Sequence, residues 1–239
     1  MPPGRLDAFV PPPPSARRAQ VLDLLAGELV VLRPGSRAVV AIDGVDGAGK
    51  TVLGRELTER VGRRREVHRA SVDGFHRPAP QRYARGRTPD TFYRDQYDHD
   101  AIRRRLVGSF RAGTPWTRAI HDVEREVAVD ALPEPPAGRD AVLVVDGIFL
   151  HRPELADLWD LTIWLEVPFD VAIPRGNARF DERDDEAAEP ASAASARHVD
   201  GQRLYLAEVG PASRATWVLD NTDLAAPVLN RRPGRRPSG

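Results

Sequence analysis

A glycine-rich segment that ends in a lysine and a threonine carries the strongest chemical signal in the sequence. Residues 44–51 read GVDGAGKT, which matches the pattern G-x-x-x-x-G-K-T in full. Glycines let such a loop curl until successive backbone N–H groups point at phosphate oxygens, and a helix that starts at its end adds the positive end of its dipole. The segment therefore predicts a loop that binds the phosphates of a nucleoside triphosphate.

Two side chains at the end of this loop have expected roles of their own. Lys50 is expected to reach the β- and γ-phosphates, and the Thr51 hydroxyl to ligate Mg²⁺. Lys50 is also the only lysine among the 35 basic residues, and a compact ammonium is not interchangeable with the planar fork of arginine. The residues expected to contact the nucleotide through the loop are Gly44, Asp46, Gly47, Ala48, Gly49, Lys50 and Thr51.

Two aspartates follow apolar runs and could complete a phosphate-transfer site. Asp146 ends the run 141–145, where proteins with this loop place the acid that holds magnesium. Asp73 follows the run 67–72, where a carboxylate can orient an acceptor hydroxyl and take its proton. Each aspartate precedes a glycine, so a turn-forming role is the alternative interpretation for both.

Three arginines are spaced four residues apart after the run 161–167, at Arg175, Arg179 and Arg183. On a helix they stack along one face, from which they could close over phosphates and neutralise the charge of a transition state. In a chain with so many arginines, an exposed surface position is the alternative. Arg175 and Arg179 are the candidate catalytic arginines.

Short apolar runs alternate with helical patterns between the two ends of the chain, and continuous apolarity is typical of strands buried on both faces of a parallel sheet. The expected strands are 38–42, 67–72, 141–145, 161–167 and 216–219, and the expected helices 17–25, 51–63 and 100–106. These features predict an α/β fold of the P-loop NTPase type: a doubly wound parallel sheet of about five strands with a small lid or substrate subdomain. Such sheets bind ligands at the carboxyl ends of their strands.

The ends of the chain differ in composition from the middle. Residues 1–16 are proline-rich and are expected to form an extended, disordered arm, and residues 231–239 a basic, disordered tail. Residues 17–230 are expected to form one domain with its lid at about 174–200. Because proline is tolerated only near a helix start, we expect Pro174, Gly176 and Asn177 to interrupt the first turn of the lid.

The bulk composition excludes several classes of protein. The 35 basic and 35 acidic residues give zero net charge, unlike a dedicated nucleic-acid binder. The chain has no cysteine and no apolar run of the roughly 18 residues that span a bilayer. We therefore expect a cytoplasmic protein that acts on a small molecule, with no nucleic-acid or membrane partner, and leave homo-oligomerisation open.

Several segments, taken in order, carry a resemblance to a known family. Besides the phosphate-binding loop they are SVDGFHRP (71–78), TFYRDQYDHDAI (91–102), VLVVDGIFLHRPELADLWDLTIWLEVPFDVA (142–172), GQRLYL (201–206) and VLDNTD (218–223). Together they resemble the uridine kinase family, which is close to phosphoribulokinase and the bacterial pantothenate kinases, over most of residues 38–224. The resemblance implies transfer of the γ-phosphate of ATP, with Mg²⁺, to a hydroxyl, most directly the 5′-hydroxyl of a ribonucleoside such as uridine or cytidine.

The resemblance also implies roles for individual residues. Asp73 matches the catalytic base, and Asp95 the acidic contact to the sugar hydroxyls. His121 falls near the segment that contacts the base, and Asn221 lies where the last strand meets the adenine. His76 is expected to line the substrate pocket, since the spacing of the histidines fits no metal-ligand pattern.

This chain departs from the family pattern at some of these positions. Asp46 stands where uridine kinases usually carry a small residue, and Arg175 and Arg179 match the lid arginines only loosely. Uridine therefore follows from the family and not from a set of base contacts in this sequence.

Other functions stay open at this point. One is a kinase of another alcohol, such as a pantothenate- or sugar-phosphate-like acceptor, and another is a regulatory or non-catalytic nucleotide-binding protein. A GTPase would need an N-K-x-D motif, which a chain whose single lysine is Lys50 cannot contain, so ATP is the expected donor. The joint presence of Lys50, Thr51, Asp73 and Asp146 argues against a non-catalytic protein.

Overall fold

Six strands form the central sheet of the computed structural model, which describes residues 15–181 and 193–231. Their order is β2-β5-β1-β6-β7-β8. The strands are β1 (Ala38–Gly44), β2 (Val67–Ser71), β5 (Val142–Gly147), β6 (Leu161–Glu166), β7 (Trp217–Asp220) and β8 (Val228–Arg231). Neighbours from β2 to β7 run parallel, and β8 is antiparallel to β7. The predicted α/β class with a mostly parallel sheet is confirmed.

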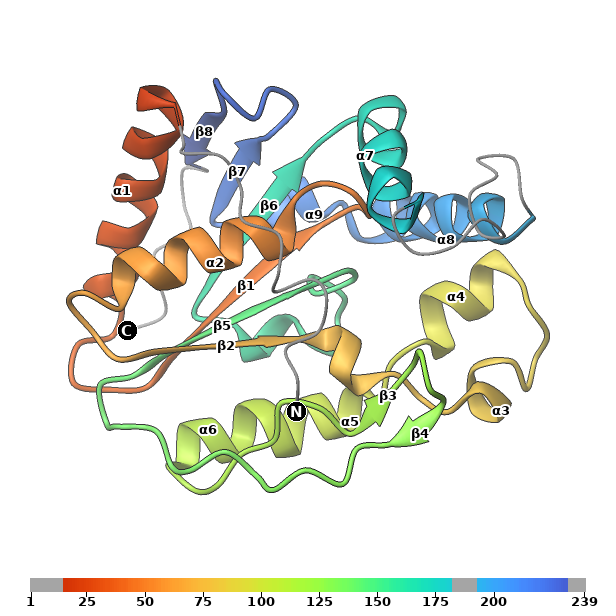
Figure 1. Cartoon of the computed structure of the whole chain (residues 1–239), viewed down its shortest axis with the longest axis horizontal. Helices are drawn as coiled ribbons and strands as arrows, with labels where there is room; N and C mark the ends of the chain where they lie inside the picture. Colours follow the sequence, from red (N-terminus) through yellow and green to blue (C-terminus); the bar gives the residue numbers. More distant parts are fainter. Residues whose placement is uncertain (1–14, 182–192, 232–239) are drawn as a thin grey trace.

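The central strands explain why the apolar runs located the sheet. Every residue of β1 and β5 is buried, and helices α1 (Ala16–Val30) and α2 (Lys50–Val61) pack together over one face (Figure 1). A strand covered on both faces needs apolar side chains throughout, and all five predicted strands are present with small shifts at their ends. The sixth strand, β8, escaped prediction because it is an edge strand on which Val228 and Asn230 are exposed.

The remaining helices lie in the connections between the strands. They are η2 (Val72–Phe75), α3 (Ala79–Arg82), α4 (Pro89–Asp95), α5 (His99–Ala101), the π-helical η3 (Ile102–Gly108), α6 (Ser109–Ala112), η4 (Ala156–Leu158), α7 (Phe169–Asp181), α8 (Ala193–Val209) and α9 (Pro211–Arg214). The predicted helix 100–106 is the middle of a longer helical run through α5, η3 and α6. The short strands β3 (His121–Asp122) and β4 (Val127–Ala128) form a separate antiparallel pair near α3 (Figure 1).

The lid region differs from the prediction. Helix α7 begins at Phe169, so Pro174 lies inside the helix and not at its start. The proline ring removes one N–H donor there, yet the helix continues through Gly176 to Asp181. The expected interruption of the first turn is therefore wrong.

The ends of the domain also lie slightly outside the predicted limits. Ser15 caps α1, because its hydroxyl accepts a hydrogen bond from the Arg18 N–H at 3.0 Å, and Arg231 ends β8. The rest of the predicted arm and tail, residues 1–14 and 232–239, lies outside the described residues. Within the described ranges, no helix combines the length and apolarity that crossing a bilayer requires.

Arg65, in the turn after α2, holds the end of α1 in place. Its side chain is buried, and the five N–H donors of its guanidinium are shared among six backbone carbonyls. These belong to Leu29, Val30, Leu32, Arg33, Ser36 and Asp140, at 2.6–3.4 Å. Helix C-termini leave carbonyls without intrahelical donors, and a single planar fork here satisfies the end of α1 and the turn that leads into β1.

Arg65→Ala is expected to lower the free energy of unfolding by about 3 kcal/mol, because several buried carbonyls lose their donor together. Chemical denaturation of the purified protein measures this. The matched control is Arg64→Ala, one residue earlier and exposed, for which a change within about 0.5 kcal/mol is expected. Equal effects of the two substitutions would contradict the role given to Arg65.

Candidate active site

The phosphate-binding loop joins β1 to α2 in the predicted place, and glycine is required at its tip. Gly47 has φ +77°, and a Cβ there would lie 1.9 Å from the Ala172 carbonyl oxygen of α7. Gly49 caps α2 with φ +97°. The loop thus lies in direct contact with the first turns of α7. Only glycine fits both the backbone conformation and the space that this contact leaves.

Lys50 lies folded back along the loop. Its ammonium donates to the Val45 carbonyl at 2.9 Å and lies 4.0 Å from the Asp46 carboxylate. A lysine ammonium has three donors, so the Val45 contact leaves capacity for phosphate oxygens. The side chain is therefore held close to the loop by a contact that does not consume it.

Thr51 and Asp146 meet as the sequence predicts for a metal site. The Thr51 hydroxyl donates to Asp146 Oδ2 at 3.0 Å, and Arg69 Nη1 lies 3.8 Å from Asp146 Oδ1. Asp146 is 2% exposed, and Oδ1 accepts no hydrogen bond within the described part of the chain. Burial raises the pKa of Asp146 to about 6, against the lowering effect of Arg69. A buried carboxylate oxygen without a donor is suited to a cation.

Magnesium fits these residues. Mg²⁺ prefers oxygen ligands and is usually held by one or two protein groups together with substrate phosphates and water. Thr51 and Asp146 offer two such oxygens beside the phosphate loop. Among residues 15–181 and 193–231 no group of three or more carboxylates and histidines could hold a metal alone, so the ion would bind together with the nucleotide.

Asp73 lies in η2, on the β2 side of the loop, with its carboxylate exposed. The Tyr97 hydroxyl donates to Asp73 Oδ1 at 3.0 Å, and burial raises the pKa of Tyr97 well above its ordinary value, so the tyrosine keeps its proton. The negative charge of Asp73 raises the pKa of Asp146, and the positive charge of Lys50 lowers it. Three of the predicted groups thus lie within electrostatic range of one another.

His76 and His121 lie near Asp73 but have little open surface, with exposures of 6% and 5%. His76 Nδ1 is 2.6 Å from the Asp73 carbonyl oxygen, and its ring lies against Tyr97. Burial lowers the pKa of His76, which keeps it neutral. His121 Nε2 is 3.2 Å from Glu126. Both histidines thus contact neighbouring groups of the chain, and their contact with the substrate stays a prediction.

Asp95 makes its described contacts away from this group. Its carboxylate pairs with Arg85 at 2.7 Å, and Arg85 also pairs with Asp90 at 3.0 Å. The Asp95 side chain is 19% exposed. A sugar diol would therefore compete with Arg85 for Asp95, a constraint that the sequence does not reveal.

The arginines of α7 are placed differently from the prediction in one respect. Arg175 donates through both terminal nitrogens to the carbonyls of Asn221 and Thr222, at 3.0 and 2.6 Å. It would have to release these carbonyls to reach a phosphate. Arg179 lies on α7, but its side chain is not among those described, and Arg183 lies outside the described residues.

Asn221 supports the loop from beneath. It is fully buried; its amide donates to the Ala48 carbonyl at 2.8 Å and accepts from Arg18 Nη1 at 3.0 Å. Arg18 is in turn paired with Glu56 at 2.6 Å. Asn221 thus contacts the loop through the Ala48 carbonyl, and its contact with the nucleotide stays a prediction.

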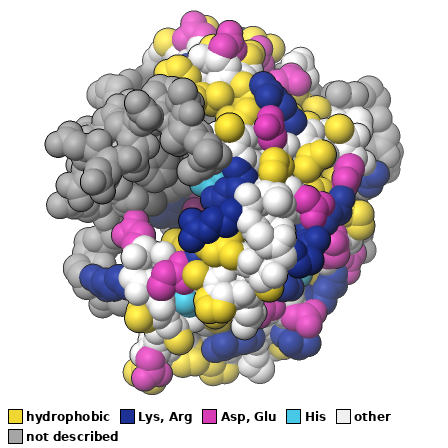
Figure 2. All heavy atoms as spheres, turned by 90° about the vertical axis from the view of Figure 1, so that its right-hand side faces the viewer, with side chains coloured by type: hydrophobic (Ala, Val, Ile, Leu, Met, Phe, Trp, Pro, Cys, Tyr) yellow, Lys and Arg dark blue, Asp and Glu magenta, His cyan; other side chains and the backbone are white. Residues whose placement is uncertain are grey.

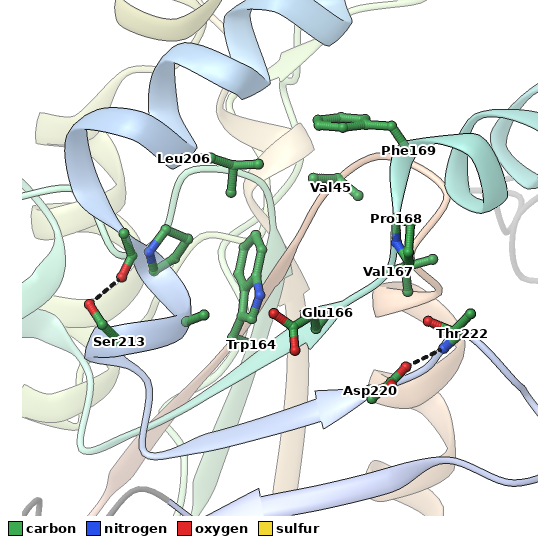
Figure 3. Close-up of a pocket in the computed structure, with 13 residues that line it drawn as sticks. Val45, Trp164, Glu166, Val167, Pro168, Phe169, Leu206, Ser213, Asp220 and Thr222 are labelled. Atoms are coloured by element: carbon green, nitrogen blue, oxygen red, sulfur yellow. Dashed lines mark hydrogen bonds between the residues drawn. The ribbon is translucent and has the colours of Figure 1, made fainter.

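A cavity of about 690 Å³ adjoins the loop on the β6–β7 side. Val45 and Trp164 are among its walls, Phe169 overhangs it, and Asp220 and Thr222 border it (Figure 3). Its volume is in the range of small-molecule sites. Asp73 lies toward β2 instead. A group of Lys and Arg side chains lies near the middle of the face that Figure 2 shows.

Three contributors to the site were not singled out from the sequence. Arg69 donates to the Thr51 carbonyl at 3.3 Å and faces Asp146. Asp43 is fully buried at the start of the loop, and Gln202 of α8 contacts its tip. A charged residue inside an apolar strand was the available signal for Asp43 and Arg69. Gln202 carried none beyond its place in the GQRLYL segment.

Comparison with known proteins agrees with this geometry. No known family's sequence profile matches the chain. Similar solved structures include a protein described as a possible uridine kinase from Bacillus stearothermophilus, at 20% identity over 84% of this chain and 97% of that chain, with a TM-score of 0.65. D-glycerate 3-kinase from Cryptococcus neoformans matches at 11% identity over 82% and 88%, with a TM-score of 0.54. Phosphoribulokinase from Rhodobacter spheroides matches at 14% identity over 78% and 70%, with a TM-score of 0.51.

These matches define the class of the chain by its fold. It has the fold of the P-loop kinases, and its phosphate-binding loop lies between the central strand β1 and helix α2. Within that class the similarity is to uridine kinase-like and phosphoribulokinase structures, which confirms at the level of the fold the resemblance seen in the sequence.

Asp146→Asn is expected to stabilise the protein without ligands and to abolish its response to magnesium. The neutral amide removes a buried charge whose pKa is raised to about 6, a shift of about 2 units, or about 3 kcal/mol at pH 7.5. Because the folded pKa lies above the unfolded value of 3.8, this gain is full only above about pH 7. It shrinks as the pH falls through 6 and is lost below 3.8, where both states hold the proton.

Urea denaturation at pH 7.5 and 4.5 measures the gain, and thermal melting with ATP, with and without magnesium, measures the metal response. Asp130→Asn, an exposed aspartate, is the control and should change neither. A less stable variant, or one that magnesium still stabilises in the presence of ATP, would contradict the metal assignment.

Proposed function

We propose that this protein is an ATP-dependent kinase that transfers the γ-phosphate to a small-molecule hydroxyl, most directly the 5′-hydroxyl of a ribonucleoside such as uridine or cytidine. The observation that carries the proposal is the convergence of Lys50, Asp146 and Asp73 at the carboxyl edge of the sheet. A nucleotide-binding protein without catalysis has no need of an exposed carboxylate held on the acceptor side of its phosphate loop.

On the donor side, the loop N–H groups and Lys50 would bind the β- and γ-phosphates. Thr51 and Asp146 would hold Mg²⁺, which neutralises charge on the phosphates when bound. The base of ATP would lie on the β6–β7 side, beside Asp220 and Thr222, where the cavity opens. Arg175, once released from its backbone carbonyls, could reach the transferred group, and Arg179 is proposed as its partner on α7.

On the acceptor side, Asp73 would orient the alcohol and take its proton as the hydroxyl oxygen forms its bond to the γ-phosphorus. The bond from that phosphorus to the bridging oxygen of ADP breaks as this bond forms. The Tyr97 hydroxyl fixes one oxygen of Asp73, so the other stays available to the substrate. This arrangement favours a base that is pre-oriented and solvent-accessible before the substrate arrives.

A second candidate is a kinase of a different alcohol. Asp95 is already paired with Arg85, which weakens the case for a ribose diol at that carboxylate. Structures with this fold include kinases named for glycerate and for phosphoribulose. A screen of nucleosides, sugar phosphates and hydroxy acids for substrate-dependent ADP formation decides between the candidates.

Asp73→Asn is expected to lower kcat by at least about 10²-fold and to leave ATP affinity unchanged, because the amide can accept a hydrogen bond but cannot take the proton. Calorimetric ATP binding and turnover on one preparation test this. Asp100→Asn, an exposed aspartate in α5, is the matched control. Loss of ATP affinity with kcat preserved would assign Asp73 to the metal site instead.

If the acceptor is a ribonucleoside held at Asp95, Asp95→Ala is expected to remove the preference for uridine over 2′-deoxyuridine. The deoxy substrate lacks the hydroxyl that would donate to Asp95 in the wild type, and losing that hydrogen bond costs roughly 1–3 kcal/mol, or about tenfold in kcat/KM. Asp90→Ala, which removes the other carboxylate paired with Arg85 and keeps Asp95, is the control and should keep the preference. Equal use of the two substrates by the wild type would make Asp95 a structural residue.

A further inference from the structure

We infer that helix α8 positions the phosphate-binding loop through Gln202 and Tyr205, and that it couples this loop to the acceptor-side helix α4. The inference rests on the proposed function for its meaning, because it concerns how the nucleotide and acceptor sides of one site communicate. Gln202 and Tyr205 are positioning residues that act through the loop. Neither is assigned a contact with substrate.

The side-chain amide of Gln202 makes two hydrogen bonds to Asp46, at the tip of the loop. Its Oε1 accepts from the Asp46 backbone N–H at 2.7 Å, and its Nε2 donates to Asp46 Oδ2 at 3.1 Å. Gln202 is itself 3% exposed, whereas the Asp46 side chain is half exposed, so these bonds are partly buried. The amide of Gln202 accepts from the backbone of Asp46 and donates to its carboxylate. The larger side chain of Asp46 is therefore hydrogen-bonded at a position where a small residue is expected.

Tyr205 lies one helical turn further along α8 and contacts Asp43, just before the loop. Its hydroxyl hydrogen-bonds to Asp43 Oδ2 and accepts from the His151 N–H at 3.1 Å. Burial, with the charge of Asp43, raises the pKa of Tyr205 well above its ordinary value, so it remains a donor. Asp43 also accepts from the Gly44 N–H at 2.8 Å. Gln202 and Tyr205 are three residues apart and therefore lie on the same face of α8. This face makes the hydrogen bonds to both Asp46 and Asp43.

Another part of α8 lies against α4 with no space between them. A Cβ on Gly201 would lie 2.7 Å from Phe92 Cδ1, and the His198 ring stacks on Phe92 with centroids 4.3 Å apart. Arg94 of α4 pairs with Glu208 at 2.5 Å. α4 is followed at once by Tyr97, whose hydroxyl holds Asp73.

A displacement of α4 therefore has a short, packed route to the loop. It runs from Phe92 to His198 and Gly201, and from the adjacent Gln202 to Asp46. Tight packing transmits shifts instead of absorbing them. Since coupling between two sites is reciprocal, an acceptor that orders α4 should tighten nucleotide binding, and the nucleotide should tighten acceptor binding.

The test is a double-mutant cycle on nucleotide affinity. Isothermal titration calorimetry measures the Kd of a non-hydrolysable ATP analogue with magnesium in the wild type, Phe92→Leu, Gln202→Leu and the double variant. We expect Gln202→Leu to weaken binding about fivefold and Phe92→Leu about threefold in the wild-type background, but Phe92→Leu to have no further effect once Gln202 is replaced. Leu204→Gln, on the exposed face of α8, is the control and should not change the Kd. Thermal melting confirms that each variant is folded.

A swap variant separates positioning from general damage. Gln202→Glu alone sets two carboxylates together and should weaken binding more than Gln202→Leu does. Adding Asp46→Asn restores a donor opposite an acceptor and should recover most of the loss. With a substrate from the alcohol screen, the ratio of Kd values with and without acceptor should be about tenfold in the wild type and near one in Gln202→Leu.

The outcomes distinguish the two levels of the argument. A wild type that binds no ATP analogue would refute the proposed function. A wild type that binds it, with independent effects of Phe92 and Gln202 or with no recovery in the swap, would overturn the role of α8 and leave the proposed function intact.

Discussion

A buried carboxylate at the end of β1 sets the geometry on which the rest of the site depends. Asp43 is fully buried and accepts hydrogen bonds from the N–H groups of Gly44, Leu150 and His151, from the His151 ring and from Tyr205. A buried carboxylate is tolerated only when donors surround it. Here those donors come from β1, from the β5–β6 connection and from α8. Satisfying one carboxylate therefore fixes three segments at the first residue of the phosphate loop.

The environments of two other aspartates separate their roles. Asp146 is buried, its pKa is raised to about 6, and one of its oxygens has no hydrogen-bond donor in the described chain. Such a group is better satisfied by a cation than by water. Asp73 is exposed and held by the neutral donor Tyr97, so it can accept a substrate proton. The roles proposed for them, metal ligand and base, rest on this difference in burial and hydrogen bonding.

The sequence predicted the parts of the site that depend on local pattern. Strands buried on both faces have continuous apolar runs, and a strand end is where a ligand can be reached, so Asp73 and Asp146 could be located before the structure. Gln202 and Tyr205 contact the loop from more than 150 residues away along the chain, and no local pattern encodes that contact. The prediction that Pro174 interrupts a helix was wrong. Helix propensity is a weak guide that tertiary packing can override, and α7 packs against Gly47.

Several arginines of this arginine-rich chain make hydrogen bonds that need a planar group with several donors. Arg65 lies within hydrogen-bond distance of six backbone carbonyls, and Arg175 donates to two. Arg18 donates to both Glu56 and Asn221. Each use depends on the spread of a planar fork with several donors. At position 50 the requirement is the opposite. The cation must lie within a loop narrow enough for Lys50 Nζ to meet the Val45 carbonyl at 2.9 Å and still present donors to phosphate. A guanidinium is wider than an ammonium, and a chain that uses arginine at its other basic positions has its one lysine here.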